Sequence, residues 1–340
     1  MYFSHLMLCD RREGLSSQER YEQQLAEVRL LEELGYWCCW FAEHHFSGYA
    51  LVPDCLLMAA AAARETKRIR LGAGVVVLPF QHHPIRVAEQ AAMVDCLSHG
   101  RLELGFGRGY QPHEFTGFGV TLEESQDRFE QALGVVTQAL NQGDDLTYAT
   151  PLFKGEHVTI WPRPVQRPIP YWGAAISGAS FTRYGQLGWP ILTFPANQPP
   201  ELLKAQIDTY RRVYRECGHD PARMRIALTM FTYVAEDADE AHATFERGMA
   251  HYFGFLHRIT TEAEVIQHNV YHSIPTTARL SGSPEQVIAR LRGLIDDFGV
   301  SDIVNITQFR GYLTHDQVVR SIRLFAEGVM PAFPPTTASR

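Results

Sequence analysis

The chain has 340 residues, of which 45% are hydrophobic, so it can bury a large core. Its net charge of -7 argues against broad binding to nucleic acids or to anionic membranes. No apolar run reaches the roughly 18 residues of a membrane helix, and the first residues do not resemble a signal peptide. The six cysteines are scattered without a CxxC pair, which favours reduced thiols and predicts a cytoplasmic protein.

Short apolar runs alternate with longer helical patterns along the first half of the chain. The apolar runs predict strands at residues 3–8, 36–42, 69–78 and 102–107. Apolar spacings of three and four, with Gly and Pro near the ends, predict the intervening helices. These helices are expected at residues 18–34 and 54–65, from residue 84 onward, and across 129–140.

The alternation continues after a proline-rich connection. Further strands are predicted at residues 170–175, 191–194, 224–235 and 303–306, and further helices at 179–187, 203–214, 239–253, 287–298 and 318–329. Eight β-then-α units predict parallel strands with right-handed crossovers, which favours a single TIM (β/α)8 barrel with insertions. Residues 143–168 and 254–284 exceed the usual loop length, so each is either a lid or binding loop or a packed peripheral excursion.

Polar side chains follow five of the predicted strands. They are Glu43-His44-His45, Gln81-His82-His83, Arg108-Gly109-Tyr110-Gln111, Ser177-Gly178-Ala179-Ser180 and Asn197-Gln198. The carboxyl ends of barrel strands carry the active site, so these clusters are expected on one rim. Their convergence predicts a functional site there more strongly than any single motif does.

The two adjacent histidines bear on the kind of site. Strand alternation sends His44 and His45 to opposite sides, unlike the paired metal ligands of barrel hydrolases. The sequence therefore disfavours a metal site and favours His44 as an acid/base residue beside Glu43, with His45 in the core. For His82 and His83 two uses stay open, a place in the site or a cap on the following helix.

The serine-rich segment 177–180 separates a predicted strand from a predicted helix. Its hydroxyls and the free amides of the helix start can bind a phosphate, or the serines can simply cap the helix. Arg108 can supply a bidentate positive charge, which favours the phosphate. Neither a GxGxxG nor a Walker sequence is present, so a Rossmann-type nucleotide site is disfavoured. Gly72 and Gly74 indicate either a flat cofactor lying against their strand or a bend in the barrel.

Three segments together resemble the bacterial luciferase-like flavin monooxygenases. They are WFAEHHF at residues 40–46, LGAGVVVLPFQHHPIRVAEQAAMVD at 71–95 and GRLELGFGRGYQPHEFTGFG at 100–119, and MPAF at 330–333 is also typical. The resemblance extends over nearly the whole chain. It implies one barrel domain over residues 1–333, a mobile lid at 254–284 that excludes water, and a flexible tail at 334–340.

The resemblance also implies an activity. By this resemblance the protein would be a two-component monooxygenase. It would take reduced FMN from a separate NAD(P)H-dependent flavin reductase. A flavin C4a-peroxide formed with O2 would then oxygenate an organic, largely apolar small-molecule substrate, with His44 in proton transfer. The family resemblance further implies a homodimer formed through helices near the start of the barrel.

The same resemblance assigns site residues. Cofactor binding would fall to Ala73, Gly74, Val75, Arg108, Gly109, Tyr110, Ser177, Gly178 and Ser180, with a cis peptide between Gly74 and Val75 beneath the flavin ring. The candidates for the substrate pocket are Glu43, Phe46, His82 and Phe194. No metal is expected.

Two positions depart from the family pattern. The light-emitting α subunit has a reactive cysteine at the position of Gly107, so a wider cavity beside the flavin is expected here. A second phosphate-binding arginine falls on Gln126, and Arg128 is expected to replace it. These differences argue against light emission from a long-chain aldehyde.

Three alternatives remain: an F420-dependent hydride-transfer oxidoreductase, a non-catalytic flavin-binding subunit and a metal-dependent hydrolase. The histidine spacing disfavours the hydrolase.

Overall fold

Eight parallel strands form a closed barrel in the computed structural model, which describes residues 1–195, 199–259 and 278–334. They are β1 (Tyr2–Met7), β2 (Cys38–Phe41), β3 (Arg70–Val77), β4 (Leu102–Gly107), β7 (Tyr171–Ala174), β8 (Ile191–Thr193), β9 (Ile226–Val234) and β11 (Asp302–Ile306). The sheet closes because β9 pairs with β8 on one side and with β11 on the other. All eight predicted strands are present, which confirms the predicted barrel.

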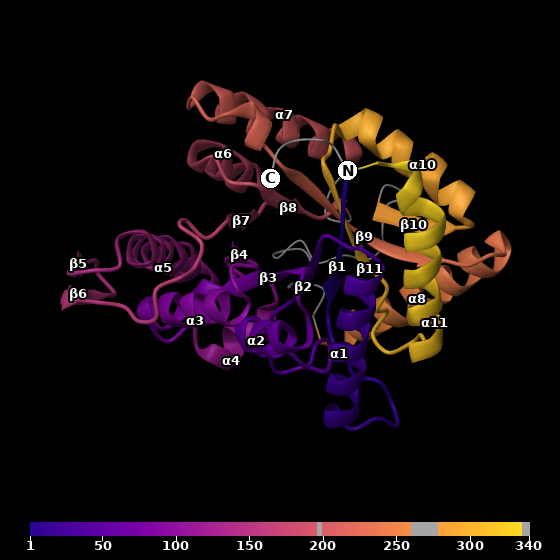
Figure 1. The fold of residues 1–340 in the computed structure, drawn as a ribbon, viewed down its shortest axis with the longest axis horizontal. Helices are drawn as coiled ribbons and strands as arrows, with labels where there is room; N and C mark the ends of the chain where they lie inside the picture. Colours follow the sequence, from indigo (N-terminus) through magenta and orange to yellow (C-terminus); the bar gives the residue numbers. More distant parts are fainter. Residues whose placement is uncertain (196–198, 260–277, 335–340) are drawn as a thin grey trace.

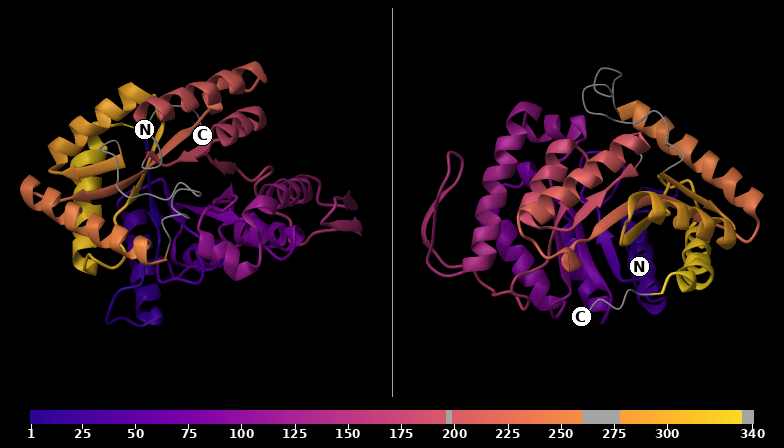
Figure 2. Two further views of the ribbon diagram at one scale, coloured as in Figure 1. Left: turned by 180° about the vertical axis from the view of Figure 1, so that it is seen from behind. Right: turned by 90° about the horizontal axis from the view of Figure 1, so that it is seen from above.

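Helices between the strands surround the barrel (Figures 1 and 2). They are α1 (Ser17–Glu33), α2 (Cys55–Glu65), α3 (Pro84–Leu97), α5 (Leu122–Gln142), α6 (Gly178–Leu187), α7 (Pro200–Glu216), α8 (Ala238–Ile259), α10 (Pro284–Phe298) and α11 (His315–Leu324). Helix α5 begins before the predicted apolar face because Thr121 and Glu124 form a capping box. In the described part of the chain, no helix is both long and apolar enough to cross a membrane.

Several short elements were not predicted. They are helix α4 (Pro112–Phe118), the hairpin of β5 (Leu146–Ala149) and β6 (Lys154–Val158), strand β10 (Arg279–Gly282), and the short turns η1 (Leu78–Phe80), η3 (Pro221–Arg223) and η6 (Met330–Ala332). The predicted helix at 318–329 is present as α11 followed by η5 (Phe325–Val329). The hairpin makes up much of the long segment 143–168 and projects from the side of the molecule beyond α5 (Figures 1 and 2). This segment is therefore a peripheral excursion.

The predicted lid at 254–284 is described only at its ends, where α8 continues to Ile259 and β10 pairs with the end of β9. Residues 260–277, the polar pair Asn197-Gln198 and residues 335–340 of the predicted tail lie outside the described residues. The lid, the tail and the domain boundary at residue 333 thus stay predictions.

Side chains fill the part of the barrel interior that lies away from the carboxyl ends of the strands. Trp40 and Trp172 meet edge to face at 5.2 Å, and Cys38, Ala227 and Val304 pack around them. A side chain at Gly72 would collide with the ring of Trp40, so this glycine makes room for a tryptophan and not for a cofactor. Above Trp40, towards the carboxyl ends of the strands, the interior is open.

Candidate active site

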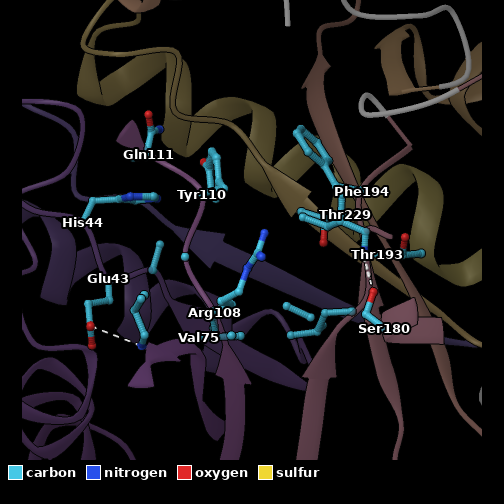
Figure 3. Close-up of a pocket in the computed structure, with 18 of the residues that line it drawn as sticks. Glu43, His44, Val75, Arg108, Tyr110, Gln111, Ser180, Thr193, Phe194 and Thr229 are labelled. Carbon is cyan, nitrogen blue, oxygen red and sulfur yellow. Dashed lines mark hydrogen bonds between the residues drawn. The ribbon is translucent and has the colours of Figure 1, made fainter. Parts of the chain in front are cut away.

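A cavity of about 860 Å³ lies at the carboxyl ends of the strands, with Trp40 among its lining residues (Figure 3). Most of the residues that the sequence analysis selected line it. These are Glu43, His44, Gly74, Val75, Arg108, Gly109, Tyr110, Ser177, Ser180 and Phe194. The volume is within the range of small-molecule sites. The structure thus gathers the ends of β2, β3, β4, β7 and β8 around one cavity.

His44 is held by a carboxylate that the sequence analysis missed. Its Nδ1 lies 2.9 Å from Oε1 of Glu114, and the same oxygen accepts the amide of His45 at 2.9 Å. Burial by itself raises the pKa of the Glu114 carboxyl. The neighbouring His44 and these hydrogen bonds lower this pKa by more than burial raises it, so the net shift is downward. The ionised Glu114 accepts a hydrogen bond from the N–H at Nδ1, which leaves Nε2 of the neutral ring as a hydrogen-bond acceptor.

Glu114 lies on α4, a helix that no apolar periodicity indicates. Pro112 occupies its first turn together with Glu114, and Gly119 ends it with a φ of 65°. Proline at the first helical position and glycine after the last were the available signals. The short helix brings a carboxylate from the loop after β4 to the histidine after β2.

Glu43 also reaches the cavity wall, but its carboxylate is bound to the protein. Its Oε1 accepts the amide of Val77 at 3.2 Å and the side-chain amide of Gln81 at 3.0 Å. Burial raises the pKa of this carboxyl. Glu43 therefore fastens the end of β2 to the end of β3. His45 packs edge-on against the rings of Phe80 and Phe118, outside the cavity.

Two of the predicted pocket residues do not line the cavity. Phe46 is 62% exposed, and its ring packs against Phe118 because the backbone turns with a positive φ of 56°. His82 is exposed on the connection between β3 and α3. The next residue, His83, accepts the amide of Ile85 and caps α3, which is one of the two uses left open for this pair.

The end of β3 forms one wall of the cavity. The Gly74–Val75 peptide is cis, as the resemblance implies, and both residues line the cavity. Ala73 is fully buried and does not line it. A Cβ at Gly107 would come within 2.5 Å of Cγ2 of Val75. The Val75 side chain thus lies in the space beside this glycine, and the expected widening at Gly107 stays a prediction.

The predicted anion site lies at the start of α6. Ser177 is the N-cap, and the hydroxyl of Ser180 accepts the amides of Ile176 and Ser177 at 3.0 Å each. Both serines cap the helix and also line the cavity, whereas Gly178 does not line it. The guanidinium of Arg108 projects into the cavity and forms no hydrogen bond or ion pair with any residue that the structure describes (Figure 3).

A second arginine reaches this region, but it is not the predicted one. Arg128 pairs with Glu124 at 3.1 Å and does not line the cavity. Arg183, on α6, does line it, and donates to Glu130 at 2.7 Å. Gln126 lines the cavity, and Arg128, two residues later on α5, lies on a different face of the helix, so Arg183 is the additional cation.

Two of the lining residues also carry a buried side-chain oxygen. Oε1 of Gln111 and Oγ1 of Thr193 form no hydrogen bond within the described part of the chain. Gln111 and Thr193 are each 1% exposed. Within residues 1–195, 199–259 and 278–334, no group of three or more His, Cys, Asp or Glu side chains is arranged to hold a metal ion.

The profile described as luciferase-like monooxygenase matches residues 1–302. The chain belongs to this family. It is 28% identical to limonene 1,2-monooxygenase of Rhodococcus erythropolis, over 82% of this chain and 72% of that protein. It is 26% identical to the alkanal monooxygenase alpha chain of Photorhabdus luminescens, over 97% of both chains. This luciferase-like protein is thus an enzyme, an oxidoreductase.

Solved structures share the whole fold. The monooxygenase RslO1 from Streptomyces bottropensis superposes with a TM-score of 0.88 and 28% identity, covering 98% of this chain and all of that one. The oxygenating constituent of 3,6-diketocamphane monooxygenase from Pseudomonas putida, solved with FMN, has a TM-score of 0.78, 18% identity and 99% coverage of both chains. An F420-dependent secondary alcohol dehydrogenase has a TM-score of 0.77, 16% identity and 98% and 99% coverage. The last two show likeness of fold alone.

Proposed function

We propose that this luciferase-like enzyme is an FMN-dependent, two-component monooxygenase acting on an organic small molecule. The observation that carries the proposal is the pairing of two features in one cavity. Arg108, which has no hydrogen-bond or ion-pair partner among the residues that the structure describes, lies in the same cavity as the amino end of α6, and a histidine oriented by a buried carboxylate lies across from it. The first suits a phosphate and the second suits a proton transfer.

The residues present fit FMN. Arg108, Ser177 and Ser180 would hold its phosphate, with Arg183 as a second cation nearby. The flat ring would lie against Gly74 and Val75, in the open part of the barrel above Trp40. When bound in its reduced form, FMN activates O2 so that one oxygen atom is transferred to the substrate. A separate NAD(P)H-dependent flavin reductase would supply it.

The protein's own share of the chemistry lies at His44. Glu114 fixes the ring through Nδ1, so that Nε2 can take or return a proton at the cavity side. The carboxylate also stabilises the imidazolium that forms when Nε2 takes a proton. Aromatic side chains around His44, such as Tyr49 and Tyr110, limit the access of water to this nitrogen.

The cofactor can be tested by anaerobic titration with reduced FMN and, separately, with F420. We expect reduced FMN to bind, and Arg108→Ala to weaken its binding by about 10- to 100-fold, because a charge-assisted hydrogen bond to phosphate is lost. Arg128→Ala is the matched control, since this arginine lies outside the cavity, and it should leave the affinity unchanged. Tight F420 binding without FMN binding would assign the protein to hydride transfer instead.

Oxygen transfer can be tested separately with labelled O2. Protein loaded with reduced FMN is mixed with labelled O2 and a panel of aldehydes, ketones, terpenes and phenols. Mass spectrometry should find one labelled atom in a product. FMN binding without any labelled product across the panel, together with undiminished release of hydrogen peroxide, would favour the non-catalytic flavin-binding alternative.

A further inference from the structure

Three arginines gather at the rim of the barrel beside the cavity. Arg11 follows β1 and Arg310 follows β11, so both lie at the carboxyl ends of two paired strands. Their side chains meet beside Gly48, where an added Cβ would lie 2.9 Å from Nη2 of Arg310 and 3.1 Å from Cδ of Arg11. The third, Arg258, lies near the end of α8. We call Arg11, Arg258 and Arg310 the rim arginines.

The ring of Phe255 joins Arg258 to the other two. The guanidinium carbon of Arg310 lies 3.8 Å from the centre of this ring, and that of Arg258 lies 5.9 Å from it. An aromatic face attracts a guanidinium group at such distances. Phe255 therefore holds two positive charges on one small area of the rim, and Arg11 adds a third.

The rim arginines have no counter-charge. None of them forms an ion pair with any residue that the structure describes. Asp10 lies close by, but its carboxylate is already bound to the buried Arg20, at 3.4 Å, and to the amide of Gly311. Burial lowers the pKa of Arg310, Asp10 raises it, and the two other rim arginines lower it, which is the effect of like charges brought together.

The backbone holds Arg310 in a strained position. Its φ is 59°, in the left-handed region that residues other than glycine seldom adopt. Its Nη1 donates to the carbonyl of Arg11 at 3.1 Å, and Nε2 of His251 lies 3.2 Å from its own carbonyl oxygen. Strain of this kind is concentrated at ligand-binding and catalytic sites.

The rim arginines border the cavity directly. Tyr49 follows Gly48 in the chain, and Tyr252 and Leu256 lie on α8 beside Phe255; Tyr49, Tyr252 and Leu256 all line the cavity. The hydroxyls of the two tyrosines lie 2.7 Å apart and fasten α8 to the loop after β2. A ligand with its apolar body in the cavity can thus reach the rim arginines with one end.

Guanidinium groups without a counter-charge indicate an anion. Their planar donors match the oxygens of a carboxylate or a phosphate. The whole chain has a net charge of -7, so this concentration of positive charge is local. The proposed site for the FMN phosphate includes Arg108 after β4, which is separated from β1 by β2 and β3. An anion at the rim would therefore belong to another molecule.

We propose that the substrate is a largely apolar molecule with an anionic end, a carboxylate or a phosphate, that binds to Arg11, Arg258 and Arg310. This inference rests on the proposed monooxygenase function, because it names the substrate class of the same site. The rim arginines are then specificity-determining residues. They hold the anionic end outside the cavity and leave the apolar body inside it, on the side where His44 lies.

The experiment compares the binding of decanoate with that of 1-decanol. The two probes share an apolar chain of the same length, but only decanoate carries a negative charge at neutral pH. Calorimetry is carried out without reductant, on the protein alone and on the protein with oxidised FMN. We expect the wild type to prefer decanoate by about tenfold or more. The preference should shrink as salt is added, because salt screens exposed charges.

Substitution of the rim arginines assigns the preference. The double variant Arg258→Gln with Arg310→Gln should reduce it to less than about twofold, by weakening decanoate binding alone. Arg310→Lys keeps a positive charge and should keep part of the preference, which guards against variants that merely fold poorly. Arg212→Gln, on α7 and paired with Glu216, is the matched control and should leave the ratio of the two affinities unchanged.

Three outcomes would overturn the inference. The first is an equal affinity of the wild type for both probes. The second is a preference that survives in the double variant and disappears in Arg108→Gln, which would place the carboxylate inside the cavity. The third is a double variant that keeps the decanoate preference but binds F420 more weakly, which would assign the rim arginines to the anionic tail of that cofactor.

These measurements do not depend on turnover. Absence of an oxygenated product would refute the proposed monooxygenase function and leave the decanoate preference as measured. A thermal melt of each variant, compared with that of the wild type, checks that the fold is intact.

Discussion

His44 acquires its orientation from a residue 70 positions later in the chain. The Nδ1–Glu114 contact fixes which nitrogen carries the proton and which faces the cavity. The edge-on ring of Tyr49, at 4.6 Å, limits rotation of the imidazole. At the scale of single residues, the site is a histidine whose chemistry is decided by a carboxylate and a phenol contributed by separate loops.

We expect His44→Ala to retain reduced-FMN binding and to lose about 10²–10⁴-fold in product formation, because a positioned proton-transfer group is removed. Glu114→Gln should keep the FMN affinity and lower kcat. The reason is that the carboxylate holds Nδ1 of His44 and stabilises the charge that forms on the ring when Nε2 takes a proton. Stopped-flow kinetics would measure both effects.

His83→Ala is the matched control for these variants. His83 caps α3 outside the cavity, so its loss should cost about 1 kcal/mol of stability and leave kcat unchanged. Full activity in His44→Ala, or an unchanged kcat in Glu114→Gln, would contradict the assignment.

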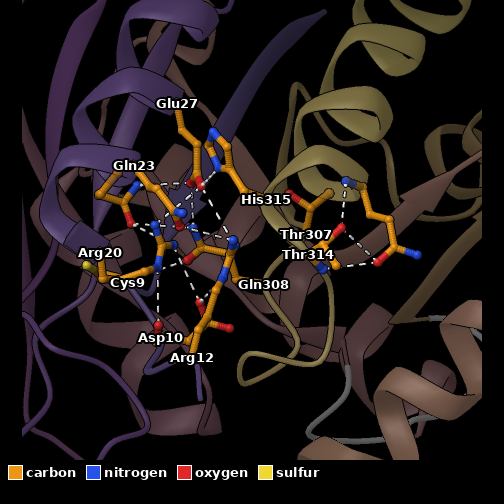
Figure 4. A network of polar contacts seen from close by, with 12 residues as sticks. Cys9, Asp10, Arg12, Arg20, Gln23, Glu27, Thr307, Gln308, Thr314 and His315 are labelled. Atoms are coloured by element: carbon orange, nitrogen blue, oxygen red, sulfur yellow. Dashed lines mark hydrogen bonds and ion pairs between the residues drawn. The ribbon is translucent and has the colours of Figure 1, made fainter. Parts of the chain in front are cut away.

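A buried ionic network holds β1, α1 and the segment after β11 together (Figure 4). Glu27, on α1, lies 3.3 Å from Arg20 and 3.2 Å from His315, and Nε2 of Gln308 donates to it at 2.8 Å. Oε1 of Gln308 in turn accepts the amides of Leu8 and Cys9. At the scale of elements, this network fixes the end of β1 against the last unit of the barrel and so supports the closure of the sheet.

Removal of one charge should destabilise this network strongly. Glu27→Gln leaves buried guanidinium groups without their carboxylate, and we expect a loss of about 3–5 kcal/mol in the free energy of unfolding. The exposed pair of Arg29 and Glu65 gives the control, because Glu65→Gln should cost less than about 1 kcal/mol. Urea titrations of the wild type and the two variants measure these losses of unfolding free energy. Equal losses in Glu27→Gln and Glu65→Gln would contradict the prediction.

The same carboxyl gives a pH dependence of stability. Burial alone raises its pKa, but Arg20, His315 and Arg12 lower the pKa of Glu27 to about 2 from a usual value of 4.5. The folded protein therefore holds a charge that the unfolded chain loses at a higher pH. The stabilisation is fully present above about pH 4.5 and is lost as the pH falls towards 2. Glu27→Gln should show a shallower fall of the unfolding free energy over this range.

At the scale of the whole molecule, the neighbouring helices α2 and α3 expose apolar side chains. Leu57 on α2 is 70% exposed, and Met93 on α3 is 54% exposed. The family resemblance implies a homodimer formed through helices near the start of the barrel. We propose that α2 and α3 form its interface, with Leu57 and Met93 buried against a second copy of the chain.

Charge on this face should separate the subunits. The double variant Leu57→Glu with Met93→Glu is expected to sediment as a monomer, because a carboxylate is costly to bury in an apolar interface. Leu202→Glu, on α7 and 48% exposed in the single chain, is the control and should leave the dimer intact. Analytical ultracentrifugation gives the mass of each, and a monomeric wild type would refute the dimer.

The eight strands and most of their helices follow from the sequence, because periodic apolar spacing records which face of each element is buried. The exceptions are short. Helix α4 and strand β10 have too few residues for a period to appear. In the hairpin of β5 and β6, β5 buries only one of its two faces. Loop residues were the least predictable, as the exposed positions of Phe46 and His82 show.

The sequence by itself determined the barrel, its family and the rim on which His44, Arg108 and Ser177 lie, since alternation and strand ends are local properties of the chain. Only the tertiary structure decided which distant side chains meet: Glu114 with His44, Val75 in the space beside Gly107, and Arg183 rather than Arg128 at the cavity. Partners of this kind come from different β/α units. Their contacts depend on how the barrel closes and on how each loop folds back over it, and no spacing along the chain encodes that.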